Sequence, residues 1–154
     1  MAIPDRLRNN PQIYAEEVFA TAEYNERFGD VATTIAARGV GGGALAALAK
    51  ELTARMDGPR PPEWSDREFL YRVYEYARSA NRKKERAEIE KAFAESADGD
   101  LVAAHVAFGN GYLCSDDHGR SAIGASVLDS DNRAWLKTAY GTNILSAQQL
   151  ADLL

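Results

Sequence analysis

The chain has 154 residues, a length that suits one domain with a substantial core, so residues 1–154 are expected to fold as a single unit. Its composition, 45% hydrophobic and 27% charged, excludes a disordered chain, and a net charge of −5 excludes a general electrostatic attraction to nucleic acid or to anionic membranes. The single cysteine, Cys114, excludes an internal disulfide and fits a cytoplasmic location, and no run of about 18 apolar residues predicts a membrane span.

The first part of the chain is expected to contain helices and one short strand. Asn10 and Pro11 are typical of a helix start, and Gly29 is a natural stop. The β-branched residues of VATTIA predict a strand. The predicted elements are a helix over 11–29, a strand over 31–36, a loop over 38–43, a helix over 44–56 and a loop over 57–64.

The second part is expected to alternate helices and strands. Ser65 and Glu68 have the spacing of a capping box, which predicts a helix that continues or restarts near residue 81. Asp98 or Asp100 opens the next helix, and a glycine turn leads into a short strand. Further elements are expected as a helix over 129–140 ending at Gly141, a strand over 143–145 and a last helix with inward Leu150, Leu153 and Leu154. This alternation predicts an α/β fold with three α/β/α layers and a parallel sheet.

Three acids are expected to meet at one edge of this sheet. A helix of ten residues advances about 15 Å, and a strand of five residues advances about 17 Å. A strand that returns beside its helix therefore brings Asp116 and Asp117 level with Asp100, at the edge where such folds bind ligands. Carboxylates suit Mg²⁺ or Mn²⁺, which activates water for attack on a phosphodiester. The alternative is that these acids only cap a helix and form a turn.

Residues 100–107, DLVAAHVA, and the later Ser115-Asp116-Asp117 resemble two motifs of the PIN-domain family. The resemblance covers residues 87–154 and implies a PIN-like fold acting as a metal-dependent ribonuclease, a hydrolase often found as the toxin of a toxin–antitoxin pair. It implies that Asp100 and Asp117 are catalytic metal ligands, that Ser115 supports them and that Glu51 supplies a further ligand, with Asp116 beside them. It also implies an antitoxin partner and a homodimer. The family's first strand and its acid have no counterpart in residues 1–13.

That missing strand leaves a second interpretation, a catalytically inactive or truncated PIN-like domain that acts as a protein- or RNA-binding module. A basic run supports contact with RNA phosphates. Its members are Arg82, Lys83, Lys84 and Arg86. The alternative for this run is a solvated helix face, because Glu85, Glu88 and Glu90 are interleaved with it.

Overall fold

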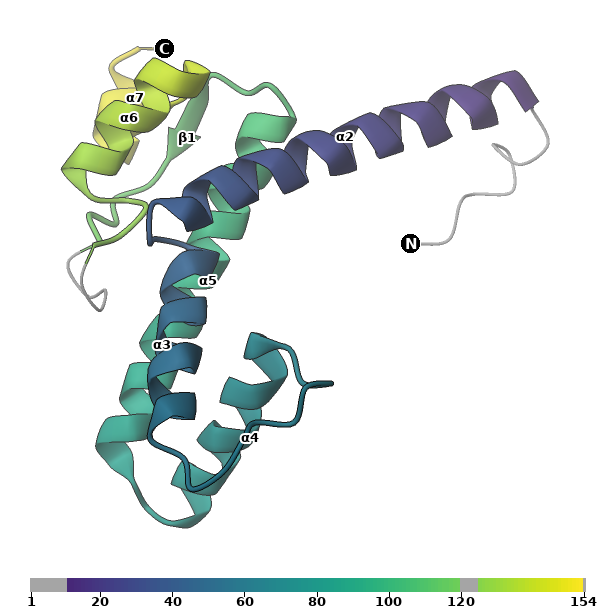
Figure 1. Cartoon of the computed structure of the whole chain (residues 1–154). Coiled ribbons are helices and arrows are strands. Elements are labelled where there is room, and N and C mark those ends of the chain that lie inside the picture. The colour runs from purple at the N-terminus through teal and green to yellow at the C-terminus, as the bar shows by residue number, and fades with distance from the viewer. Residues whose placement is uncertain (1–10, 120–124, 154) are drawn as a thin grey trace.

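The computed structural model describes residues 11–119 and 125–153, with side chains described from Thr21 onward (Figure 1). Helices dominate this part of the chain. In chain order the elements are α2 (Pro11–Ala37), α3 (Gly42–Ala54), α4 (Asp66–Ser79), α5 (Lys83–Ala107), β1 (Tyr112–Cys114), α6 (Ser130–Tyr140), β2 (Asn143–Leu145) and α7 (Ala147–Ala151).

The predicted three-layer α/β/α architecture is wrong. The sheet of the described residues has only two strands, β1 and β2, which pair in parallel with Leu113 opposite Ile144. Helix α6 connects them, so the expected alternation holds only for this small C-terminal β-α-β unit. The rest of the described chain is a helical body.

The segment predicted as a strand, residues 31–36, lies inside α2. Val31 and Ile35 are one helical turn apart, and both are buried in the core. The Thr34 hydroxyl donates to the Asp30 carbonyl oxygen at 2.8 Å, which satisfies this polar side chain within the helix. Gly29 does not end the helix, and Asn10, the expected cap, lies outside the described residues. Burial at helical spacing therefore outweighs the strand preference of β-branched residues.

Helix α5 runs without a break through Asp98 and Asp100, so the helix start predicted at these acids is also wrong. Its buried face is continuous, from Ile89 to Val106. Gly99 is an inward position at which the turn before α3 touches the helix: a Cβ atom there would lie 2.7 Å from the Cα atom of Gly41. This glycine permits close packing rather than ending the helix.

Helix α5 joins two hydrophobic cores, and Figure 1 shows it as the axis of the molecule. Its C-terminal half packs with α2 and the β-α-β unit around Ile35, Val102 and Leu136. Its N-terminal half packs with α3 and α4 around Leu52 and Phe69. Figure 1 also shows that the N-terminal half of α2 extends away from the other elements.

Other predicted helix ends are confirmed, in contrast to those at Gly29 and at Asp98 or Asp100. The Ser65–Glu68 and Ser146–Gln149 pairs both form capping boxes. Gly141 ends α6 in the left-handed conformation, as expected. The inward packing predicted for the last helix is only partly right: Leu150 is half-buried, Leu153 is 61% exposed, and Leu154 lies outside the described residues.

No single helix of the described chain has the length and apolar character to cross a membrane. Residues 21–37 and 42–54 meet those requirements only when taken together, and they are bent by 53° relative to one another.

Candidate nucleic-acid interface

The acids predicted to bind metal have separate protein partners. Asp100 is exposed on α5, with Oδ2 at 3.7 Å from Nη2 of Arg67. Glu51 is exposed on α3 and pairs with Arg55 one turn later. Asp116 Oδ1 accepts a hydrogen bond from the backbone N–H of Ala147 at the start of α7, at 3.4 Å.

Asp117 and Ser115 form a compact turn after β1. The backbone N–H of Asp117 donates to Ser115 Oγ at 3.2 Å. Asp117 Oδ1 in turn accepts from the backbone N–H of Gly119 at 2.7 Å. Ser115 therefore supports the position of Asp117 within this turn, whereas its predicted role at a metal site stays a prediction.

Asp98, rather than Asp100, is the helix acid beside Asp117. A small cavity of about 70 Å³ is lined by both Asp98 and Asp117 and by Glu95, but not by Asp100. Burial, followed by the negative charges of Glu95 and Asp117, raises the pKa of Asp98 above its ordinary value. Within the described residues, no three His, Cys, Asp or Glu side chains are placed so that they could hold a metal ion.

Glu95 is a buried carboxylate, 4% exposed, that links three segments of the chain. Its Oε1 accepts hydrogen bonds from the backbone N–H groups of Gly41, at 2.9 Å, and Val127, at 2.7 Å. Its Oε2 accepts from the Ser126 hydroxyl at 2.8 Å. The role of Glu95 was not predicted from the sequence. The sequence pattern that could have indicated it is an acid on the helix face shared by the apolar residues Ile89 and Ala92.

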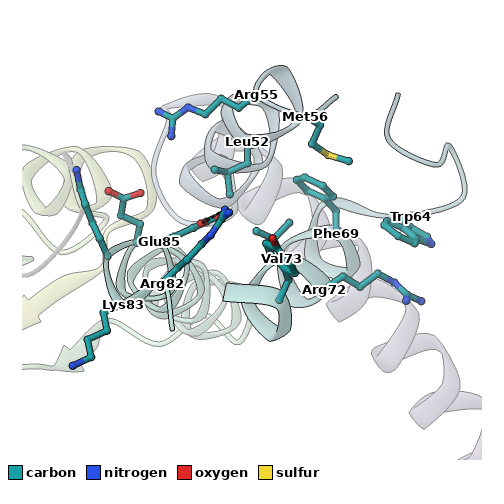
Figure 2. Close-up of a pocket in the computed structure, with 13 residues that line it drawn as sticks. Leu52, Arg55, Met56, Trp64, Phe69, Arg72, Val73, Arg82, Lys83 and Glu85 are labelled. Atoms are coloured by element: carbon teal, nitrogen blue, oxygen red, sulfur yellow. Dashed lines mark hydrogen bonds and ion pairs between the residues drawn. The ribbon is translucent and has the colours of Figure 1, made fainter. Parts of the chain in front are cut away.

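A hollow with a volume of about 780 Å³ lies between the end of α3, helix α4 and the start of α5 (Figure 2). We call it the basic groove. Leu52, Phe69 and Val73 give it apolar walls. Five cationic side chains line it, against only two acids, Glu85 and Glu88. The cationic residues are Arg55, Arg72, Arg82, Lys83 and Lys84.

Aromatic rings and guanidinium groups are layered in the basic groove. The Arg72 guanidinium lies over the Trp64 ring at 4.3 Å from its centroid, and the Arg82 guanidinium lies over Tyr76 at 5.0 Å. Figure 2 shows Arg82 reaching across the hollow toward Leu52 and Val73. Arginine held over an aromatic face remains charged and planar, so it presents both a stacking surface and donors for phosphate.

The predicted RNA-contacting residues are mostly in this groove. Arg82, Lys83 and Lys84 line it, whereas Arg86 does not and instead pairs with Glu90 at 3.6 Å. Arg82 also pairs with Glu85 at 3.4 Å. Lys83 and Lys84 are exposed and form no ion pair with another described residue, and Figure 2 shows Lys83 pointing outward. The aromatic wall from Trp64 and the contribution of Arg55 and Arg72 were not predicted, because they depend on how α3 and α4 pack against α5.

Comparison of the chain with protein-family models, with curated proteins and with solved structures gives no match.

Proposed function

We propose that the chain is an RNA-binding module that holds the backbone of an RNA strand in the basic groove. The observation that carries this proposal is the lining of that groove, in which five cationic side chains surround aromatic rings already covered by guanidinium groups. Phosphate contacts from arginine and lysine supply most of the affinity of such binding and do not read sequence. We place the module in the cytoplasm, where the exposed thiol of Cys114 would stay reduced.

The test is charge reversal at Lys83 and Lys84, with binding of a fluorescent 12-nucleotide RNA followed by anisotropy. Both side chains are exposed, so the variant should fold, and we expect Lys83→Glu with Lys84→Glu to weaken binding about tenfold or more.

The matched control reverses Lys50 and Lys137 to Glu. These lysines are also exposed but lie outside the basic groove, and the change in net charge is the same. The control should bind nearly as well as the wild type. Equal losses in the two variants would mean that only overall charge matters, and absence of binding by the wild type would refute the proposal.

Cleavage of RNA with Mg²⁺ or Mn²⁺ is a second candidate function, favoured by the carboxylates around the small cavity. Asp98 forms no hydrogen bond with another described residue, and burial, followed by the negative charges of Glu95 and Asp117, raises its pKa. Asp98 and Asp117 are the residues that would hold the ion, and a bound ion supplies an activated water. An antitoxin partner and a homodimer remain predictions of the resemblance.

Adding Mn²⁺ while following the melting temperature and RNA cleavage tests this candidate. We expect Mn²⁺ to raise the melting temperature of the wild type and of Asp100→Asn, but not that of Asp98→Asn, since only Asp98 lines the cavity. EDTA should abolish cleavage. A wild type that neither gains stability nor cleaves RNA would exclude this function, and loss of both effects in Asp100→Asn alone would restore Asp100 as the ligand.

A further inference from the structure

A second hollow adjoins the basic groove at Arg72. It has a volume of about 460 Å³ and lies between α4 and α5. We call it the side pocket. Arg72 lines both spaces, so the side pocket and the groove border the same side chain. Its residues are Arg67, Glu68, Tyr71, Arg72 and Phe93.

Aromatic and apolar surface dominates the side pocket. Tyr71 on α4 is 60% exposed, so much of its ring is open to solvent. Phe93 is half-buried on the opposite helix and supplies a second ring. An open tyrosine beside a phenylalanine offers ring faces to a planar partner, and two arginines, Arg67 and Arg72, line the pocket beside these rings.

Arg67 is held in place at this pocket by its neighbours. Its guanidinium lies 5.7 Å from the centroid of the Phe93 ring, and Nη2 donates to Ser96 Oγ at 3.1 Å. Asp100 adds a carboxylate at 3.7 Å from the same nitrogen. Asp100, predicted as a metal ligand, is therefore also placed to orient an arginine that faces the pocket.

We propose that the side pocket receives an unpaired nucleobase from the strand whose phosphates lie in the basic groove. This inference rests on the proposed function. Tyr71 in the pocket and Tyr76 in the groove are five residues apart on α4, about 7.5 Å along the helix axis and about 140° around it. A strand of a few nucleotides reaches both by passing Arg72, which lines both hollows. A base stacks on Tyr71 while the adjoining phosphates contact the cationic side chains. The pocket therefore distinguishes a strand with exposed bases from a polyanion without them.

The experiment compares two fluorescent strands of equal length and charge, a 12-nucleotide oligouridine and its abasic analogue, by anisotropy. The wild type should bind the abasic strand roughly tenfold more weakly, the effect expected for loss of one base stacked on an aromatic ring. Tyr71→Ala should bind both strands equally, with the affinity that the wild type has for the abasic strand. Tyr112→Ala, a change at a similarly exposed tyrosine on β1, should behave as the wild type.

Photocrosslinking gives a readout that does not depend on a variant. A strand carrying 5-iodouridine should crosslink to Tyr71 or Phe93, as mapped by mass spectrometry, and crosslinks confined to other residues would overturn the inference. Equal binding of the two strands by the wild type would overturn it as well, while loss of affinity on charge reversal at Lys83 and Lys84 would still support the groove. If neither strand binds, the proposed function fails with it.

Discussion

The Glu95 side chain holds three segments in place: helix α5, the turn before α3 and the segment at residues 126 and 127. Helix α5 carries it, and its oxygen atoms accept hydrogen bonds from the turn before α3 and from residues 126 and 127. The same carboxylate lines the small cavity beside Asp98 and Asp117. A buried carboxylate with several donors is stabilising only while all of them remain paired.

Two substitutions of Glu95 distinguish the loss of its hydrogen bonds from the loss of its negative charge. Glu95→Ala leaves two backbone N–H groups and a hydroxyl unpaired in a buried site, and we expect it to lower the free energy of unfolding by about 3 kcal/mol or more. Glu95→Gln keeps one oxygen for the N–H groups of Gly41 and Val127, and its amide donates to Ser126, so we expect a loss of about 1 kcal/mol.

Urea denaturation followed by circular dichroism measures both variants. Ser79→Ala on exposed α4 is the control, since its hydroxyl donates only to a carbonyl oxygen three residues earlier. Equal losses for Glu95→Ala and Glu95→Gln would show that charge, rather than the satisfied hydrogen bonds, is what the fold requires at this position.

Asp98 and Asp100 show where residue type and spacing were not enough. Either acid could open the predicted helix, and only Asp100 was predicted to lie beside Asp117, whereas Asp98 lines the cavity with Asp117. In a continuous helix the two are separated by about 200° around the axis. Asp98 therefore shares the face of Glu95, and Asp100 turns toward Arg67. Which of the two acids faces Asp117 depends on how α5 is rotated about its own axis, and the packing of α5 over its whole length sets that rotation.

At the scale of elements, the sequence predicts helix ends at Ser65, Ser146 and Gly141 but fails at Gly29 and at Asp98 or Asp100. Capping residues act through local hydrogen bonds, so Ser65, Ser146 and Gly141 could be assigned from the sequence. The element type of residues 31–36 could not be assigned in this way. The β-branched residues favour a strand, but the same segment also fits a helix whose buried positions recur every three or four residues. Contact of α2 with α5 decides between these alternatives, and the sequence alone does not contain that contact.

Two helical glycines, Gly99 in α5 and Gly29 in α2, should respond oppositely to alanine. A Cβ atom at Gly99 would lie 2.7 Å from Gly41 Cα, so α5 and the turn before α3 must separate, whereas one at Gly29 meets no atom within 4 Å. We expect Gly99→Ala to lower the free energy of unfolding by about 1–3 kcal/mol. Gly29→Ala should raise it by about 0.5–1 kcal/mol through helix propensity.

Thermal and urea unfolding of the two single variants and the wild type provides the measurement. Stabilisation by Gly99→Ala would contradict the close approach of α5 to the turn before α3. Destabilisation by Gly29→Ala would place an unrecognised neighbour against that face of α2.

At the scale of the whole molecule, charge is unevenly distributed. The net charge of −5 repels RNA, yet five cationic side chains gather between α3, α4 and α5. The carboxylates of Glu95, Asp98 and Asp117 lie against the other half of α5, near the β-α-β unit. An RNA strand in the basic groove is therefore attracted by the local positive charge of the groove, although the net negative charge of the whole molecule repels it.

The salt dependence of RNA affinity distinguishes these two contributions, because added salt weakens the attraction by the groove and also weakens the repulsion by the net charge. Added salt screens the repulsion from the net negative charge and would strengthen binding if that charge governed the affinity. Binding through the groove releases counterions from the strand, and for three phosphates the affinity should fall about 20-fold between 50 and 200 mM KCl. Anisotropy titrations across this range measure the slope, and the Lys83→Glu, Lys84→Glu variant should show a shallower one. An affinity that rises with salt would remove the groove as the source of binding.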